Sequence, residues 1–194
     1  TTHQQTRPPE KGILLDALRA VEASQPTLLD RIELIKEEIK TEYRQAHSKP
    51  WIIGFSGGKD STLVLHLVIE ALLELPWSQR KRPVYVVAND TLVESPIVED
   101  FVDQTLDHVA AGLEDLQLPC TVHKTTPQIS HTFWVNLIGR GYPSPTRMFR
   151  WCTDRMKIRP TTDFIRSKVS ENGEVILLLG VRRSESSARA ATAR

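Results

Sequence analysis

Hydrophobic and polar residues along this chain follow periods that predict helices and strands in alternation. In residues 26–47, apolar side chains recur at steps of three and four, which is typical of one helix face: Leu28, Ile32, Ile35, Ile39 and Tyr43. The acidic and basic side chains of this segment balance, so we expect a packing or docking helix that carries no chemistry. The dozen residues that begin the chain have no such period, and we expect them to be loosely attached.

Short apolar runs predict four buried strands, at residues 51–55, 83–88, 118–124 and 175–179. Helices are expected between them, at residues 60–75, after the Ser95–Pro96 pair and at residues 162–170. Strands that alternate with helices indicate parallel β-α-β units. The predicted fold class is therefore α/β, a doubly wound and mainly parallel sheet with flanking helices. We expect an N-terminal helical extension over residues 1–48 and one domain over residues 49–194.

Composition and cysteine usage narrow the class of protein. Hydrophobic residues make up 40% and charged residues 25%, as in ordinary globular domains. The longest apolar stretch, residues 62–75, is interrupted by His66 and Glu70 and is too short to span a bilayer. Two cysteines, Cys120 and Cys152, do not form a disulfide framework. We therefore expect a cytoplasmic protein with reduced thiols and no membrane association.

Charge is unevenly distributed although the formal net charge is only +1. Residues 90–119 contain eight acidic side chains and no Lys or Arg, whereas residues 140–160 contain six basic side chains and one Asp. Four more arginines follow near the end of the sequence: Arg182, Arg183, Arg189 and Arg194. Such clusters suit either a solvated face or a surface that neutralises phosphates, and the charge pattern alone leaves both open.

A glycine-rich segment, SGGKDS at residues 56–61, connects the first predicted strand to a buried helix. Glycines let backbone N–H groups approach an anion closely, and a helix N-terminus adds partial positive charge. Ser56, Ser61 and Thr62 can donate hydroxyl hydrogen bonds, and Lys59 supplies a point charge. The spacing fits neither a Walker A loop nor a dinucleotide fingerprint. We predict a phosphate loop made of Ser56, Gly57, Gly58, Lys59, Asp60, Ser61 and Thr62, in which Asp60 holds Mg²⁺.

This loop resembles that of the ATP pyrophosphatase (PP-loop) superfamily, and specifically its PAPS/APS reductase-like branch. Three further segments are similar to that branch: Asn89-Asp90-Thr91, where Leu92 replaces a glycine; the run from Cys152 to Pro160; and the run from Gly180 to Ser186. From about residue 50 onward the chain resembles the DndC family of DNA phosphorothioation proteins of the Dnd system.

The resemblance implies an ATP pyrophosphatase that cleaves ATP between its α and β phosphates. It implies adenylation of a DNA backbone phosphate oxygen, followed by sulfur incorporation with a cysteine desulfurase as sulfur source and other Dnd-system proteins as partners. Lys59, Asp60, Arg182 and Arg183 would be catalytic, with Arg189 as a further clamp. Asn89, Asp90, Thr91, Gly180 and Arg182 would join the phosphate loop in binding ATP and Mg²⁺.

The basic run would then hold DNA phosphates near the loop, through Arg147, Arg150, Arg155, Lys157 and Arg159. Aromatic residues interleave with these charges, and rings of this kind can stack on bases. We expect Trp151 to be the better stacking candidate and Trp134 to be the better core or loop anchor.

The resemblance also implies a 4Fe–4S cluster, of which Cys152 is a possible ligand. Trp151 occupies the place of a second cysteine, and two cysteines cannot supply the four ligands that such a cluster prefers. We therefore expect the intact protein to be longer and its cluster to be absent from this chain. Cys120, at the start of an apolar strand, is expected to be a buried structural residue.

Two other functions compete with DNA modification. One is a PAPS/APS sulfonucleotide reductase, although the reactive cysteine that such enzymes carry in a C-terminal tail is not seen here. The other is a non-catalytic nucleotide-binding subunit that docks partners through its N-terminal and acidic helices. A tRNA-thiolating enzyme would share the ATP chemistry and differ in its nucleic acid.

Overall fold

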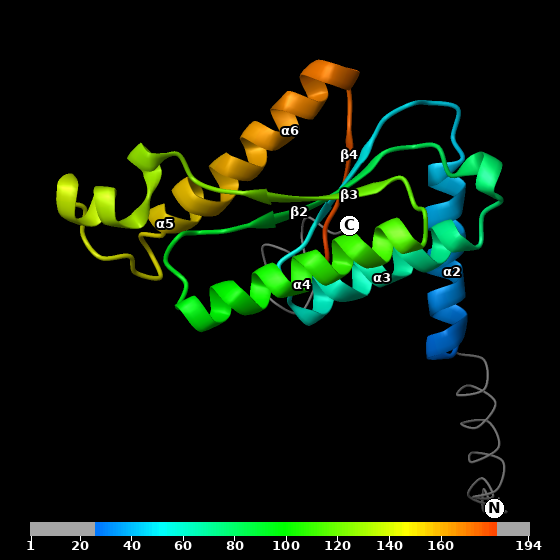
Figure 1. The fold of residues 1–194 in the computed structure, drawn as a ribbon, viewed down its shortest axis with the longest axis horizontal. Coiled ribbons are helices and arrows are strands. Elements are labelled where there is room, and N and C mark those ends of the chain that lie inside the picture. Colours follow the sequence, from blue (N-terminus) through cyan, green and yellow to red (C-terminus); the bar gives the residue numbers. More distant parts are fainter. Residues whose placement is uncertain (1–25, 182–194) are drawn as a thin grey trace, which may run out of the picture.

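The computed structural model describes residues 26–181 and contains one parallel four-stranded sheet with helices on both faces (Figure 1). The strands are β1 (Trp51–Gly54), β2 (Val84–Asn89), β3 (Cys120–Thr125) and β4 (Ile176–Leu178), in the spatial order β3-β2-β1-β4. All three pairings are parallel, with Trp51 opposite both Val84 and Ile176. The predicted α/β fold class is confirmed.

The strand order determines where a ligand can enter. The chain steps outward from β1 to β2 to β3 and then returns to place β4 on the other side of β1. β1 and β4 are therefore neighbours in the sheet, with β2 on the other side of β1. Crevices at such reversals are the usual ligand sites of open α/β sheets.

Helices α3 (Lys59–Leu73) and α4 (Pro96–Asp115) cover one face of the sheet, and α6 (Arg159–Asn172) lies on the other (Figure 1). The main core lies on the first face, where strand residues such as Trp51, Ile53 and Val86 meet Leu65 and Leu72 of α3. Ile52 and Val87 point to the opposite face and are also buried. Because both faces are covered, the strands read as continuous apolar runs. No helix among residues 26–181 is long and apolar enough to cross a membrane.

Helix α2 (Leu28–Tyr43) begins at a capping box, in which Thr27 and Asp30 exchange hydrogen bonds, and it packs on α3. Its buried face follows the predicted stripe only in part, since Tyr43 is buried and Ile39 packs against the core. Lys36, Lys40 and Tyr43 are buried, whereas Leu28 and Ile35 are exposed. The reason is electrostatic: both lysines reach Glu74 beyond the end of α3, at 2.5 and 2.6 Å. Apolar periodicity alone could not detect this pairing.

The segment after β3 is more helical than expected. It contains a short 3₁₀ turn, η2 (Ile129–His131), and a π-helical stretch, η3 (Val135–Gly139). After a loop, α5 (Trp151–Thr153), the π-helical η4 (Asp154–Ile158) and α6 form one continuous helix, so the helix predicted at residues 162–170 starts earlier. Pro160 does not end this helix, because it occupies an initial position of α6 just after the wide π turn. Ser95 precedes α4 as predicted but makes no capping side-chain bond.

Candidate nucleotide site and adjoining arginine lobe

The glycine-rich loop links the buried end of β1 to the exposed start of α3. Gly57 has φ of +69°, a left-handed conformation that side chains with a Cβ adopt at a cost. Gly58 occupies the N-cap position of α3, where no side chain caps the helix. The first N–H groups of a helix without a side-chain cap are a suitable cradle for an anion. Lys59 begins the helix on the exposed surface.

Ser61 shapes this loop from within. Its hydroxyl donates to the Gly58 carbonyl at 2.9 Å and accepts from the Ser56 N–H at 3.2 Å. Ser61 is buried, and its single hydroxyl proton is already used inside the loop. We therefore correct its expected role: Ser61 holds the loop in shape, and Ser56 and Thr62 are the exposed hydroxyls.

The turn after β2 contains a strained residue. Leu92 has φ of +60°, in the left-handed region that suits glycine, at the position where the resembling branch has a glycine. The Asp90 carboxylate accepts from the Leu92 N–H at 2.8 Å and so holds the turn. Thr91 is buried and donates to Glu94 at 2.9 Å, which makes it part of the turn rather than of the surface.

A cavity of about 410 Å³ lies at the carboxyl ends of β1 and β2, between α3 and α4. Its polar wall includes Ser56, Gly57, Thr62, Asn89 and Asp90. Its apolar wall comes from β1, α3 and α4 and includes Phe55, Leu65, Val98, Phe101 and Val102. A cavity of this size, with one apolar wall and a few polar groups, is typical of small-molecule and cofactor sites. Five of the residues predicted to bind the nucleotide therefore share one cavity.

The loop after β4 closes against the phosphate loop. A Cβ at Gly180 would lie 2.7 Å from the Asp60 carbonyl oxygen and 3.2 Å from the Ser61 nitrogen. Only glycine fits this approach without moving the backbone. Gly180 thus brings the end of β4 to the start of α3, as the strand order requires. The predicted clamps Arg182, Arg183 and Arg189 lie outside the described residues.

Lys157 of η4 also lines the cavity. The sequence analysis placed it among the nucleic-acid residues, and the structure places it in the lining of this cavity. Its helix is anchored there because the Thr161 hydroxyl donates to Asn89 Oδ1 at 2.8 Å, and Thr125 donates to the same oxygen at 2.6 Å. On the opposite wall, Lys124 pairs with Asp103 at 2.7 Å and lies 3.5 Å from Asp90.

Residues 128–159 form a separate projection, which we name the arginine lobe. Trp151 is its anchor: the side chain is 7% exposed, stacks on Phe133 at 5.4 Å and donates to the Pro143 carbonyl. Trp134 is 56% exposed. The sequence analysis had expected Trp134 to be the anchor and Trp151 to be available for stacking. The structure shows the reverse. The lobe needs an internal core, and Phe133, Tyr142 and Trp151 supply it through ring contacts.

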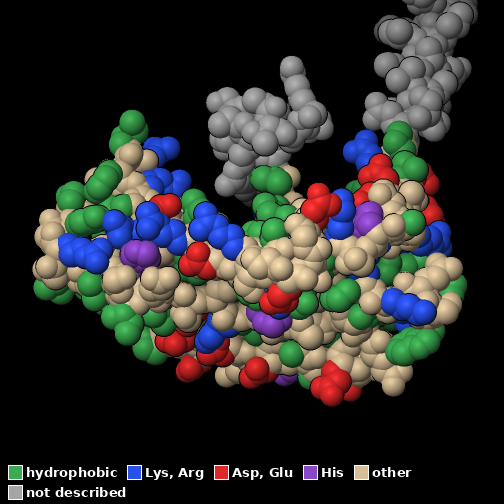
Figure 2. All heavy atoms as spheres, turned by 90° about the horizontal axis from the view of Figure 1, so that it is seen from above, with side chains coloured by type: hydrophobic (Ala, Val, Ile, Leu, Met, Phe, Trp, Pro, Cys, Tyr) green, Lys and Arg blue, Asp and Glu red, His purple; other side chains and the backbone are tan. Residues whose placement is uncertain are grey.

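The basic side chains of the lobe fall into two groups. Arg147 and Arg150 are exposed on the loop before α5. Arg155 is held by Tyr142, whose hydroxyl accepts from it at 2.7 Å and whose ring lies 5.0 Å away. Arg159 pairs with Asp154 at 2.8 Å. Figure 2 shows Lys and Arg side chains gathered around a histidine at the end of the molecule that carries this lobe.

Two features of the lobe were not predicted from the sequence: the tether of Arg140, which belongs to the basic run, and the surroundings of His131. Arg140 donates to Asn136, a buried residue that also donates to the carbonyls of Ser130 and Thr132. The pKa of His131 is lowered by burial and then by Arg159, Arg155 and Arg140, with Asp154 acting in the opposite direction. No spacing in the sequence connects these residues, because they meet only when η2 and η3 fold against η4.

The cysteines do not converge. Cys152 is half-buried in α5, and Cys120 is half-buried at the start of β3, where burial raises the pKa of its thiol to about 12. Within residues 26–181, no three His, Cys, Asp or Glu side chains are arranged to hold a metal ion. These residues therefore do not fit an iron–sulfur cluster. Mg²⁺ bound together with phosphates needs only one or two carboxylates, which Asp60 or Asp90 could supply.

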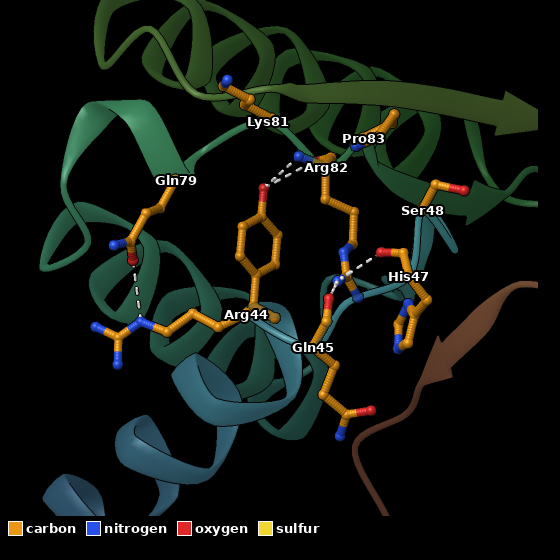
Figure 3. A pocket seen from close by; sticks show the side chains of 9 residues that line it. Arg44, Gln45, His47, Ser48, Gln79, Lys81, Arg82 and Pro83 are labelled. Atoms are coloured by element: carbon orange, nitrogen blue, oxygen red, sulfur yellow. Dashed lines mark hydrogen bonds between the residues drawn. The ribbon is translucent and has the colours of Figure 1, made fainter.

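A second hollow, of about 540 Å³, lies at the amino ends of the strands (Figure 3). Arg82 is its central residue: it is buried and donates to the carbonyls of Gln45 and His47, both at 2.9 Å. The Tyr43 hydroxyl donates to the Arg82 carbonyl and accepts from its N–H. These bonds satisfy the carbonyls that follow α2, so the arginine is structural.

Residues 50–194 match the phosphoadenosine phosphosulfate reductase domain. The chain belongs to this family. The parallel sheet agrees with this family match. They support the PP-loop assignment and do not reach the DndC family specifically.

Two individual proteins are similar to this one. The uncharacterized protein MJ0066 of Methanocaldococcus jannaschii is 30% identical over 152 residues, which cover 78% of this chain and 26% of that protein. The chain thus spans about a quarter of the length of this relative. The solved U34-tRNA thiolase NcsA from Methanococcus maripaludis, with its 4Fe–4S cluster, aligns at a TM-score of 0.46 and 14% identity, covering 82% of this chain and 50% of that one.

Proposed function

We propose that this chain binds ATP in the cavity at the carboxyl ends of β1 and β2 and cleaves it between the α and β phosphates. The observation that carries the proposal is the shared cavity of about 410 Å³, whose polar wall is the glycine-rich loop and the turn after β2. Its apolar wall suits a purine ring, and its loop suits phosphates. Family membership supports an adenine nucleotide as the ligand.

Each part of the site has a proposed role. The uncapped N-terminus of α3 and Lys59 bind the pyrophosphate end of ATP, and Gly57 allows the backbone to approach it. Asp60 is the proposed carboxylate for Mg²⁺, which would neutralise phosphate charge when bound. Lys157, which enters the cavity from η4, would stabilise charge that develops on the α-phosphate. Arg182 and Arg183 would complete the clamp.

The proposed acceptor is a backbone phosphate oxygen of a nucleic acid, with DNA phosphorothioation as the resulting modification. That oxygen would attack the α-phosphorus of ATP, the bond between the α-phosphorus and the bridging oxygen would break, and pyrophosphate would leave. A sulfur donor fed by a cysteine desulfurase would then displace AMP from the nucleic-acid phosphorus. The net charge of the arginine lobe, which adjoins the cavity through Lys157, supports an anionic polymer as acceptor.

Product analysis tests the nucleotide reaction. The protein is incubated with ATP labelled on its α-phosphate, Mg²⁺ and DNA, and nucleotides are separated by chromatography. From the wild type we expect pyrophosphate, with the α-phosphate label on DNA or, after hydrolysis of that adduct, in AMP. Lys59→Ala should react at least tenfold more slowly, about the effect of removing one charged transition-state contact. Lys81→Ala, at the opposite edge of the sheet, is the matched control and should react normally. ADP and phosphate as products would refute α–β cleavage.

The family match favours one other candidate, a sulfonucleotide reductase. In that case the cavity would hold an adenylyl sulfate, and a thiol would reduce its sulfate to sulfite. Sulfite release from an adenylyl sulfate in the presence of a dithiol, without any need for DNA, would decide for this reaction.

A further inference from the structure

The arginine lobe holds its charges in fixed positions. Arg155 is tied to the Tyr142 hydroxyl at 2.7 Å, Arg140 to Asn136 Oδ1 at 3.3 Å and Arg159 to Asp154 at 2.8 Å. Two of these three tethers are neutral, so they orient the guanidinium group and leave its charge intact. A positioned guanidinium loses less conformational entropy when it meets a phosphate than a freely rotating one does.

The lobe has almost no acidic side chains to neutralise these arginines. Residues 128–159 contain five arginines and one lysine but a single carboxylate, that of Asp154. A solvated face usually mixes both signs of charge. A fixed, one-signed cluster of this kind is instead typical of a surface that binds a polyanion.

Large apolar side chains are exposed on the same lobe. Met148 is 97% exposed, Trp134 56% and Phe149 46%. They are not left over from the core, because the lobe has its own aromatic core of Phe133, Tyr142 and Trp151. Exposed rings beside arginines are the arrangement that stacks on bases, and bases offer their faces to a protein only where they are unpaired.

We propose that the arginine lobe binds an unpaired stretch of nucleic acid, with Arg140, Arg155 and Arg159 on its phosphates and Trp134 stacked on a base. The inference rests on the proposed function in one respect, since the bound strand would be the acceptor presented to the nucleotide cavity. The helix that carries Arg155 and Arg159 also carries Lys157, which lines that cavity. The strand and the nucleotide would thus meet on the two sides of η4.

Binding is measured by fluorescence anisotropy with short labelled oligonucleotides of one sequence, as single-stranded DNA, single-stranded RNA and duplex DNA, without ATP. We expect either single strand to bind at least about tenfold more tightly than the duplex, because base stacking adds to the phosphate contacts. Comparison of the two single strands then identifies the natural acceptor.

Matched variants separate the two kinds of contact. Trp134→Ala should weaken single-strand binding about tenfold, whereas Trp77→Ala, an exposed tryptophan in η1 (Trp77–Gln79), should change nothing. Arg159→Ala should weaken binding and lower the slope of log K against log salt by about 0.7. Arg166→Ala, farther along α6, is its control. Tyr142→Phe keeps the ring and removes only the Arg155 tether, so a loss of about threefold is expected even though the lobe stays folded.

The outcomes that overturn the proposal are distinct. Equal binding of duplex and single strand, insensitive to Trp134→Ala, would mean a surface for phosphates alone. Binding of polyaspartate in preference to every oligonucleotide would mean an acidic protein partner. AMP formation without oligonucleotide binding would sink this inference and leave the nucleotide reaction standing. Oligonucleotide binding without AMP formation under any condition would refute the nucleotide reaction and leave this inference standing.

Discussion

The amino and carboxyl edges of the sheet both carry lysine and arginine side chains, but these cations have different partners at the two edges. At the amino edge, every buried cation is satisfied: Arg82 donates to backbone carbonyls, and Lys36 and Lys40 share Glu74. At the carboxyl edge, Arg155 and Arg140 are held by neutral partners and keep their charge. Left-handed backbone occurs at both edges, at Gly57 and Leu92 on the carboxyl side and at Gln117 and Gly173 on the amino side.

The difference indicates how stability and function divide in this molecule. A buried cation that is neutralised or caps a helix contributes to folding and has little left to offer a ligand. A cation tethered by a hydroxyl or an amide contributes less to folding, because its charge stays solvated or waits for an anion. Two hollows of comparable size therefore have different meanings, and we assign function to the one that the glycine-rich loop and Lys157 line.

The sharpest test compares two arginines. Arg82→Met should lower the free energy of unfolding by about 3 kcal/mol, because buried carbonyls lose a charged donor. Arg155→Met should lower it by about 1 kcal/mol or less, since a single hydroxyl and one ring contact are lost. Urea denaturation followed by circular dichroism measures both. Equal losses would erase the distinction between the edges.

The next test addresses the carboxyl edge. Gly180→Ala should cost about 2 kcal/mol, because a Cβ would overlap the backbone of Asp60 and the phosphate loop must shift. Gly112→Ala in α4 is the control; nothing lies within 4 Å of its Cβ, so it should be neutral or stabilising. We also expect Gly180→Ala to lose ATP binding, measured by calorimetry. Unchanged binding would separate the β4 loop from the site.

Substitutions of Leu92, in the strained turn after β2, should change the free energy of unfolding by a smaller amount and in either direction. Leu92→Gly should raise the free energy of unfolding by up to about 1 kcal/mol by relieving the left-handed strain. Leu92→Val should lower it by about 1 kcal/mol, because a branched Cβ tolerates positive φ poorly. Thermal denaturation ranks the three proteins. A ranking with leucine above glycine would show that the side chain at this position matters more than its backbone.

The smallest effect concerns Glu74 at the amino edge. Hydrogen bonds from Lys36 and Lys40 lower the pKa of this carboxyl from its usual 4.5, so its contribution to stability is present above that value and is lost as the pH falls through the folded pKa. Glu74→Gln should therefore be slightly less stable than the wild type at neutral pH, and the two should converge in acid. Parallel pH profiles would assign the effect to packing.

Local sequence signals predicted the positions of the four strands along the chain well. The four apolar runs, the glycine-rich loop and the turn after β2 lie where sequence periodicity and turn chemistry expected them. These features depend on neighbours in the chain. The lysine face of α2 and the helical start at Trp151 were missed, because a distant carboxylate and a distant aromatic cluster decide them.

The candidate site, like the fold, was predictable where it depends on residues that are close together in the chain. Ser56, Gly57, Thr62, Asn89 and Asp90 were expected to act together, and they line one cavity. The position of Lys157 and the tethers of Arg140 and Arg155 could not be foreseen, since they depend on how the lobe folds back onto the helix. The roles of Trp134 and Trp151 were exchanged for the same reason: exposure is a property of tertiary packing.

The π-helical stretch η4 has a geometric consequence for the whole carboxyl edge. In an α-helix each residue advances about 100° around the axis. One extra residue in a wide turn therefore rotates all later side chains of the helix to a different face. That rotation lets Trp151 face the interior of the lobe while Thr161 reaches Asn89 on the sheet. The wide turn thus acts as an angular spacer between the core of the arginine lobe and the part of the helix that contacts the sheet.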